Sequence, residues 1–439
     1  MGSLSAVCIV SLVVLSLFVN YSLGANLCRD LVDDPRDCDA ASECITANPS
    51  GTVCQCQCTK GYVDISPDPV NKPGRKCKKA FNPNKMRIAQ IAPLYESIPP
   101  KLYGGTERVV SFLTEELVRR GHEVTLFASA DSTTSAQLVS HPSFPSVRAI
   151  NERNETISMF HEMGIQWIFD QVRLKADEFD ILHFHTDIHY AIVGPFLERT
   201  VATLHGKMGL PSYVPFFNYF NKNPLISISD NQRTHLNAHP NWVGTVYHGI
   251  PKDSLPFMEN SKGTYLAFLG RTSEEKKPEW AIEIAVRAGI PLKMAAKVSD
   301  GPGTALEKRW KNLVKPLVDK HSDLVEYIGE INETEKAEFL GNAIALIFPI
   351  DWPEPFGIVM IEAMACGCPV VARPRGSVPE VIDEGVTGLT FESLDEGVAA
   401  VKRASKLDRK KIREVFEQRF TSEKMADNYL QMYQKILKH

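Results

Sequence analysis

Residues 344–369 constrain the fold of this chain more than any other stretch. They begin with an uninterrupted apolar run at 344–348, which is typical of a strand buried on both faces. Two prolines keep the next segment out of a helix or a sheet ladder. Helix-forming residues then run from Gly357 to Cys366 and stop at a glycine and a proline. The pattern predicts a strand, a rigid loop and a helix, and open α/β sheets bind their ligands at such loops.

Two carboxylates belong to this segment. Glu362 is the single charged residue on a helix that must bury most of its surface, and a buried charge is costly unless it is hydrogen-bonded. It either lies at a helix edge that reaches water or is tied to a nearby arginine. Glu354 precedes the helix, and the free amides of Phe356, Gly357 and Ile358 lie between the two carboxylates. A polyhydroxylated ligand with a phosphate tail would satisfy the carboxylates and the amides together.

Residues 354–362 resemble the Glu-x7-Glu motif of retaining, nucleotide-sugar-dependent glycosyltransferases of family 4, and the similarity continues through 363–371 and 376–382. The resemblance implies the α/β fold called GT-B, in which two Rossmann-like, doubly wound domains face a cleft. It also implies that Glu354 contacts hydroxyls of the donor sugar and that Glu362 contacts the ribose of the nucleotide. The amides of residues 356–358 would then line the sugar site.

The first 25 residues contain an uncharged apolar run, 6–19, followed by small residues suited to cleavage. The run is short for a membrane span, so we interpret residues 1–25 as a secretory signal peptide. No Lys or Arg precedes the run, and an uncleaved anchor is the alternative. We expect the chain to enter the secretory pathway and to be secreted or to stay in the lumen of the ER or Golgi. The sequons at Asn154 and Asn332 would then carry N-glycans.

Seven of the ten cysteines fall between residues 28 and 77. Dense cysteine in so short an exported segment indicates a disulfide scaffold, because a small unit cannot bury enough core alone. A zinc site is disfavoured because residues 26–80 contain no histidine. The cysteine order in 26–78 resembles an EGF-like module, a candidate surface for a protein contact, with 79–85 as a linker. The disulfide candidates are Cys28, Cys38, Cys44, Cys56, Cys58 and Cys77. This choice leaves Cys54 over, which indicates an unusual or an intermolecular pairing.

The rest of the chain alternates strands and helices. By the resemblance, residues 86–258 form an acceptor domain that the last helix, 423–439, rejoins, and residues 259–422 form a donor-binding domain. Gly104 and Gly105 follow the first strand, and paired glycines at a helix start let backbone amides approach an anion. Such turns are also common at strand–helix junctions for structural reasons alone. In family 4 the matching loop approaches the donor diphosphate and the acceptor. The dinucleotide-binding pattern G-x-G-x-x-G is missing, so hydride transfer is poorly supported.

Histidines mark two strand ends in the acceptor domain. His183, His185 and Asp187 alternate and share one strand face, as metal ligands can. The sequence offers no second ligand cluster, so we interpret the two histidines as lining a cleft or as satisfied core residues. His205 ends the next strand, where a sheet presents its ligands. It matches the family's His-Gly pair, whose imidazole lies near the reacting sugar, and is our catalytic candidate together with Glu354.

A charged loop, 270–277, precedes a helix predicted at 278–288. Basic residues at a helix start oppose the helix dipole unless an anion lies between them, although a solvated charged loop is the alternative. The family carries Gly-Arg-x3-Glu-Lys here and binds the donor diphosphate with the arginine and the lysine. Arg271 and Lys276 match those two positions. The glycine that often follows is Lys277 in this chain.

The sequence and the resemblance together predict a glycosyltransferase of the hexosyltransferase type that moves a sugar, with retention, from a nucleotide-diphosphate sugar to an acceptor hydroxyl. Arg271 and Lys276 would stabilise the leaving diphosphate, so we expect no metal and no cofactor. The acceptor can be a glycan, a lipid or a small molecule. A net charge of −4 argues against a nucleic-acid partner. The alternatives are a hydrolase built on Glu354 and Glu362, and an exported, inactive sugar- or partner-binding protein on the same scaffold.

Overall fold

The structure is a computed structural model. The residues that it describes are 42–46, 54–58, 62–64, 77–79, 82–102, 104–151, 157–188, 196–259, 261, 263–301 and 303–438. They belong to two compact units, residues 1–81 and 82–439, which we describe separately. The predicted signal peptide, Cys28, Cys38 and the sequon at Asn154 lie outside the described residues.

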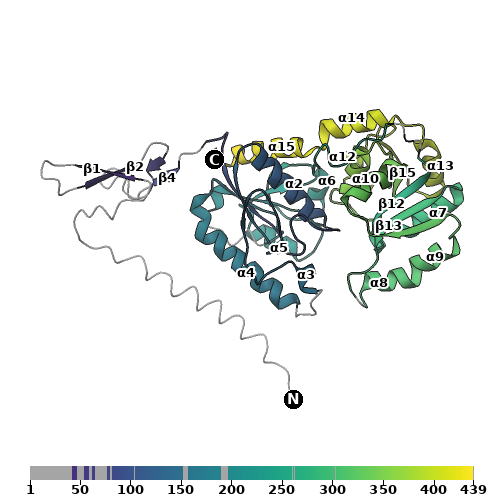
Figure 1. Cartoon of the computed structure of the whole chain (residues 1–439), viewed down its shortest axis with the longest axis horizontal. Coiled ribbons are helices and arrows are strands. Elements are labelled where there is room, and N and C mark those ends of the chain that lie inside the picture. Colours follow the sequence, from purple (N-terminus) through teal and green to yellow (C-terminus); the bar gives the residue numbers. More distant parts are fainter. Residues whose placement is uncertain are drawn as a thin grey trace, which may run out of the picture. The chain divides into compact units, whose positions relative to one another are not determined.

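The described residues of the first unit form two antiparallel strand pairs (Figure 1). The pairs are β1 (Ser42–Thr46) with β2 (Cys54–Cys58), and β3 (Tyr62–Asp64) with β4 (Cys77–Lys79). Cys44 is the register partner of Cys56 across the first pair. The EGF-like character and the disulfides of this unit stay predictions.

The second unit begins with a seven-stranded parallel sheet of order β11-β10-β9-β8-β5-β6-β7. Its strands are β5 (Arg87–Ile91), β6 (Glu123–Phe127), β7 (Gln137–Val139), β8 (Ile181–Phe184), β9 (Thr200–Thr203), β10 (Pro224–Ser227) and β11 (Asn241–Thr245). The chain adds strands outward from β5 first in one direction and then in the other. The switch between β5 and β8 is the place where open α/β sheets bind ligands.

The helices of this first half connect the strands of the sheet. They are α2 (Gly105–Arg119), α3 (Val147–Asn151), α4 (Ile157–Lys175), the short η2 (Ala176–Glu178), α5 (Tyr213–Tyr219) and α6 (Asp230–Thr234). Right-handed strand–helix–strand connections of this kind are the rule for parallel sheets, and they bring the carboxyl ends of all the strands to one edge.

A second parallel sheet of six strands has the order β14-β13-β12-β15-β16-β17. Its strands are β12 (Tyr265–Arg271), β13 (Leu292–Lys297), β14 (Val325–Gly329), β15 (Ala343–Phe348), β16 (Val370–Ala372) and β17 (Gly388–Thr390). Its order switches between β12 and β15. Strand β15 is the apolar run at 344–348 that the sequence predicted, and the sheet buries almost all of it.

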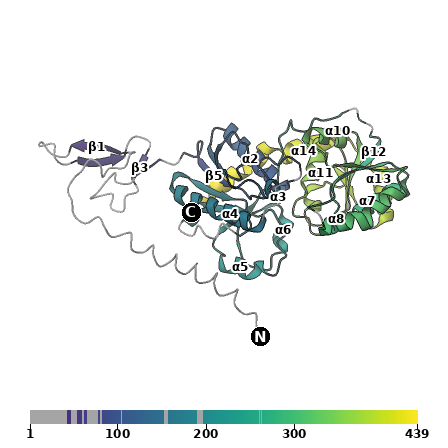
Figure 2. The same ribbon diagram turned by 60° about the horizontal axis from the view of Figure 1, so that its bottom comes forward.

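Helices cover both faces of the second sheet (Figures 1 and 2). They are η4 (Glu274–Lys276), α7 (Pro278–Ala288), α8 (Ala305–Arg309), η5 (Trp310–Val314), α9 (Lys315–Lys320), α10 (Glu333–Gly341), α11 (Ile358–Ala365), α12 (Val378–Val381), α13 (Leu394–Ala404) and α14 (Arg409–Arg419). The predicted helix at 278–288 is α7, which begins at a proline, as helix starts often do. The predicted glycosylation site Asn332 is exposed and caps α10 through its side chain.

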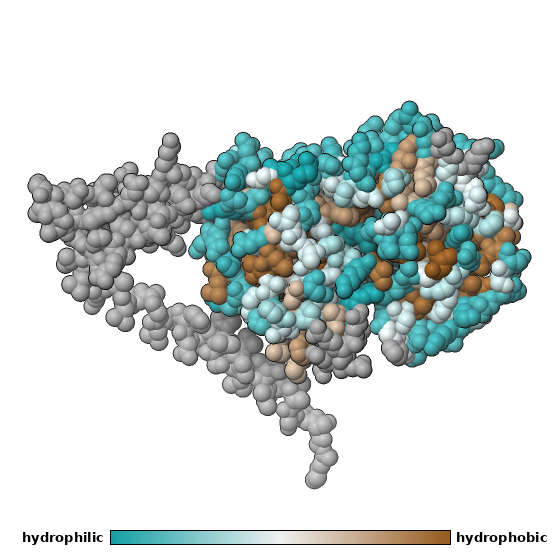
Figure 3. Space-filling view, viewed as in Figure 1, coloured by the Kyte–Doolittle hydropathy of each residue, from teal (hydrophilic) through white to brown (hydrophobic). Residues whose placement is uncertain are grey.

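The last helix, α15 (Ser422–Ile436), returns to the first half and packs beside α2 (Figure 1). Tyr429 and Tyr433 project from it into the core of the first half and are fully buried. On the face in Figure 3, hydrophilic side chains predominate in the second unit, with apolar areas between them. Within the described residues, no helix combines the length and the apolar character that crossing a membrane requires.

Candidate active site

A cavity of about 540 Å³ lies in the second unit between the carboxyl ends of the two sheets. It is lined from the first half by loops that follow β5, β9 and β11, and from the second half by loops that follow β12, β13 and β15 and by α11. All ten site residues predicted from the sequence line it: Gly104, Gly105, His205, Arg271, Lys276, Glu354, Phe356, Gly357, Ile358 and Glu362. The structure therefore brings them together, and their individual roles stay predictions.

Two helices begin at the wall of this cavity. The N-cap of α2 is Gly104, with φ 154°, and the N-cap of α11 is Gly357, with φ 75°. Both backbone conformations favour glycine, and a Cβ at Gly104 would lie 2.7 Å from the Cβ of Pro100. Neither N-cap residue caps its helix with a side chain. The first-turn amides of both helices are thus directed toward the space in which a ligand would lie.

The loop between β15 and α11 is held by a second loop. The backbone amide of Ser377 donates to the carbonyl of Glu354 at 2.9 Å, and the Ser377 hydroxyl donates to the carbonyl of Phe356 at 2.8 Å. A Cβ at Gly376 would lie 2.2 Å from the amide nitrogen of Glu354, so the two backbones touch where only glycine fits. This contact fixes the position of the Glu354 side chain at the cavity.

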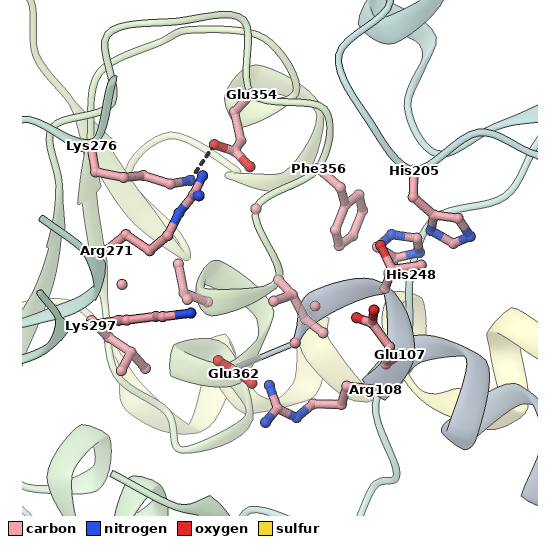
Figure 4. A pocket seen from close by; sticks show the side chains of 18 of the residues that line it. Glu107, Arg108, His205, His248, Arg271, Lys276, Lys297, Glu354, Phe356 and Glu362 are labelled. Atoms are coloured by element: carbon pink, nitrogen blue, oxygen red, sulfur yellow. Dashed lines mark hydrogen bonds and ion pairs between the residues drawn. The ribbon is translucent and has the colours of Figure 1, made fainter. Parts of the chain in front are cut away.

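Glu354 forms an ion pair with Lys276, a residue that the sequence predicted to bind the diphosphate. Its Oε2 accepts from Lys276 Nζ at 2.6 Å and from the indole nitrogen of Trp352 at 2.8 Å (Figure 4). Arg271 lies beside this pair and contacts Glu275 at 3.2 Å. The sequence had assigned the lysine to an anion and the glutamate to a sugar, without a bond between them. In the structure each holds the other in place.

Glu362 has a cationic partner that no motif marked. It is buried on α11, and its Oε1 lies 2.6 Å from Lys336 Nζ of α10, which is also buried. Lys336 contacts Glu333 at 2.7 Å, and Glu333 contacts Arg108 of α2 at 2.8 Å. The alternative of an edge exposed to water is wrong, and the partner is a lysine rather than an arginine. Alternating charges thus cross the cavity from the first half to the second.

A second contact joins the two halves. Glu380 of α12 accepts from the backbone amides of Asp230 and Asn231 at 2.8 and 2.7 Å, and from the hydroxyl of Tyr247 at 3.0 Å. The two amides belong to the first turn of α6, so a carboxylate of the second half caps a helix of the first. Together with the bond between Glu333 and Arg108, it holds the walls of the cavity facing each other.

Four histidines cluster beneath the first-half wall. His183, His185 and His248 are buried, His205 is half-buried, and burial lowers the pKa of all four, that of His205 to about 3. His183 and His185 each use both ring nitrogens in hydrogen bonds, so the interpretation as satisfied core residues is confirmed. Within the described ranges, no three His, Cys, Asp or Glu side chains are grouped to hold a metal.

Sequence reasoning missed several titratable residues of the cavity wall, and His248 and Glu107 are two of them. His248 stacks on His205, with ring centroids 5.2 Å apart, and it could have been found because the His-Gly pair of 205–206 recurs at 248–249. Glu107 is buried in the first turn of α2 near Arg108, and burial raises its pKa to about 7 (Figure 4). Its carboxyl group therefore changes charge near neutral pH, inside the cavity.

Two protein-family models match this unit one after the other. Residues 103–249 match the model described as Glycosyltransferase Family 4, and residues 252–422 match the model described as Glycosyl transferases group 1. The chain carries the catalytic region of a family 4, group 1 glycosyltransferase. The resemblance seen in the sequence is thereby confirmed for this region, and neither model extends before residue 103.

Relatives agree with this membership. N-acetyl-alpha-D-glucosaminyl L-malate synthase of Bacillus anthracis is 26% identical over 376 residues, covering 76% of this chain and 95% of the relative. An uncharacterized glycosyltransferase of Methanocaldococcus jannaschii is 23% identical over 300 residues, covering 62% of this chain and 82% of the relative.

Among solved structures, sucrose-phosphate synthase of Thermosynechococcus elongatus superposes with a TM-score of 0.63 at 19% identity, over 81% of this glycosyltransferase and 100% of the synthase. HepE of Anabaena, in complex with UDP-glucose, superposes with a TM-score of 0.60 at 15% identity, over 81% and 100% of the two chains. These likenesses confirm the GT-B fold with its two Rossmann-like domains.

Proposed function

We propose that this glycosyltransferase moves a sugar from a nucleotide-diphosphate sugar to an acceptor hydroxyl, with retention of configuration and without a metal ion. The observation that carries the proposal is the cavity itself, which joins two open helix starts, the basic residues Arg271 and Lys276 and the carboxylates Glu354 and Glu362. HepE with UDP-glucose and a starch synthase with ADP show that this fold accommodates nucleoside diphosphates.

The charges of the second half suit a leaving diphosphate. Arg271, Lys276 and Lys297 extend from one wall into the cavity (Figure 4). As the bond to the sugar breaks, negative charge grows on the diphosphate, and fixed cations and helix-start amides stabilise it without reorganising. Lys276 is positioned by Glu354, so it is already aimed at the cavity before a donor binds. These groups can supply the electrostatic stabilisation that a divalent cation supplies elsewhere.

The first half supplies the neighbourhood of the reacting sugar. His205 and His248 lie near the start of α2, and Phe356 of the second half packs against His248 with ring centroids 4.8 Å apart (Figure 4). The neutral imidazoles can exchange hydrogen bonds with sugar hydroxyls but carry no charge to compete with the basic wall. Closure of the two halves around both substrates would exclude water, so that transfer prevails over hydrolysis.

Replacing Lys276 with glutamine is expected to lower kcat by about a hundred- to a thousandfold, because one fixed charge on the transition state is lost. The measurement is an initial rate with the best donor from a panel of radiolabelled nucleotide sugars. Lys277→Gln is the matched control, since this neighbouring lysine contacts Asp351 and Glu279 outside the cavity lining. Its rate should stay within about twofold of the wild type, because partly exposed ion pairs contribute little. Equal losses in both variants would contradict the assignment.

The same donor panel decides between the competing functions. Release of free sugar without transfer to any acceptor would favour a hydrolase, and donor binding without turnover would favour an inactive binding protein.

Addition of EDTA is expected to leave the rate of sugar transfer unchanged. The reason is that Arg271, Lys276 and helix-start amides line the part of the cavity that we assign to the diphosphate, and the described residues contain no group of three His, Cys, Asp or Glu that could hold a cation. The control is a metal-dependent glycosyltransferase treated with the same EDTA stock. Loss of activity that Mg²⁺ or Mn²⁺ restores would refute metal independence.

A further inference from the structure

A chain of hydrogen bonds connects His205, at the cavity wall, with the C-terminal helix α15. Nε2 of His205 lies 3.0 Å from Nδ1 of His185, and Nε2 of His185 lies 2.6 Å from the side-chain oxygen of Gln90. The amide nitrogen of Gln90 donates to the hydroxyl of Tyr433 at 3.2 Å. Gln90, His185 and Tyr433 are buried, so water does not compete for these bonds.

The side-chain amide of Gln90 determines which atom donates and which accepts in each of these hydrogen bonds. Its oxygen can only accept, so Nε2 of His185 must carry a hydrogen. A neutral imidazole has one N–H, and Nδ1 of His185 is therefore an acceptor that takes the hydrogen of His205 Nε2. It follows that Nδ1 of His205 carries a lone pair and no hydrogen. Burial, which holds the pKa of both rings far below neutral, keeps them in the neutral form that this reasoning requires.

The far end of the chain is consistent with the same direction. Tyr433 accepts from Gln90, which leaves its own hydrogen available to Nδ1 of His183, 2.7 Å away. Nε2 of His183 then donates to Thr203 at 2.7 Å, and Thr203 donates to Tyr429 at 3.2 Å. Reversal of the Gln90 amide would reverse every donor along the chain and would place a hydrogen on Nδ1 of His205.

This series of hydrogen bonds ends at the cavity, at the ring of His205. Within the part of the chain that the structure describes, Nδ1 of His205 is buried and has no hydrogen-bond partner, although His205 lines the cavity. A buried polar atom without a partner is costly, and a bound ligand that donates a hydrogen bond removes that cost.

We propose that Gln90, itself held by Tyr433, fixes the tautomer of His205 through His185, so that His205 presents a bare Nδ1 as acceptor for a substrate hydroxyl. Gln90, His185 and Tyr433 are positioning residues, because none of them lines the cavity. The hydroxyl part of this inference rests on the proposed transferase function, whereas the tautomer part does not. This proposal also assigns α15 an indirect role in positioning His205, since Tyr433 belongs to the helix that returns to the first half.

The tautomer is measured by ¹⁵N NMR of the full chain labelled in its histidine rings, without substrate, with the His205 signals identified by their loss in His205→Asn. In the wild type, Nε2 of His205 should have the shift of a protonated nitrogen and Nδ1 that of a bare one. Gln90→Met and Tyr433→Phe should move both shifts toward a mixture of tautomers. Tyr429→Phe is the matched control, because it removes an equally buried hydroxyl of α15 that lies beyond Thr203. A hydrogen on Nδ1 in the wild type, or unchanged shifts in Gln90→Met, would overturn the proposal.

Kinetics test the hydroxyl part. Gln90→Met should lower kcat by about ten- to a hundredfold, as loss of a group that orients a functional imidazole does elsewhere, while KM for the donor stays near the wild-type value. Circular dichroism checks that the variant is folded, and Tyr433→Phe gives a second, smaller perturbation of the same bond. A changed tautomer with unchanged kcat would overturn the role assigned to Nδ1. Absence of turnover in the wild type would count against the proposed function alone.

Discussion

Replacing Lys336 with methionine is expected to lower the free energy of unfolding by about 3–5 kcal/mol. Lys336 and Glu362 are 4% and 2% exposed, and their charged atoms lie 2.6 Å apart. Methionine fills a similar volume but leaves the carboxylate of Glu362 buried without its cation. A buried charge without a partner costs much more than the intact pair contributes, because water cannot solvate it. Urea unfolding followed by circular dichroism measures the loss.

The double variant Lys336→Met with Glu362→Leu separates this cause from a packing defect. It removes both charges, so most of the lost stability should return. Glu333→Gln is a further control, since Glu333 also contacts Lys336 but its side chain is 42% exposed, and the expected loss is below about 1 kcal/mol. A double variant that is less stable than Lys336→Met would show that the ion pair is not the reason.

Stability is expected to fall steeply as the pH is lowered from about 6.5 to 5. His183, His185, His205 and His248 are held neutral in the folded chain because burial lowers their pKa, whereas the unfolded chain takes up protons on them near pH 6.5. The unfolded state then binds more protons than the folded state, so acid favours unfolding. Each histidine contributes up to about 1.4 kcal/mol per pH unit, and four contribute up to about 5 kcal/mol per pH unit.

Glu96 and Glu107 oppose this trend. Burial raises the pKa of both carboxyl groups, that of Glu107 to about 7, so above the ordinary pKa of glutamate the folded state still holds protons that the unfolded state has released. Their contribution to stability grows as the pH falls, but these two groups act against the four clustered histidines and against His122 and His161, whose pKa burial also lowers. Glu107→Gln should therefore make the fall below pH 6.5 steeper by about one proton. Urea midpoints between pH 5 and 7 give the proton number, and a flat or rising stability toward pH 5 would refute the account.

Much of the site follows from local sequence signals. The apolar run of β15, the prolines after it and the glycine that starts α11 each act within a few residues, and together they place Glu354 and Glu362 at the edge of a sheet. The departure at Lys277 is also local. This residue has φ 47° and is the one non-glycine with positive φ among the described residues, and such a conformation favours glycine, the residue that the family resemblance leads one to expect there. The Gly104–Gly105 turn predicted the start of α2 for the same reason.

The partners of the site residues could not be predicted in this way. The buried carboxylate of Glu362 requires a cationic partner, but no local sequence signal identified Lys336 as that partner. The His183 and His185 pair suggested a shared strand face, but not that Tyr433 of the last helix would bond to His183 and to Gln90, the partner of His185. Glu107 has no distinguishing spacing in the sequence, and the repeated His-Gly pair that marks His248 does not show that packing buries both side chains and shifts their pKa values.

The sequence by itself determined the family, the two alternating α/β halves and the ten residues that line one cavity, because strand burial, helix starts and glycine conformations depend on neighbours along the chain. The tertiary structure alone decided which polar and charged side chains pair with each other. Lys336 bonds a residue 26 positions away, Lys276 one 78 positions away and His183 one 250 positions away. Such pairs form only when both groups lose water in the same place, and the order of residues in the chain does not state where that place is.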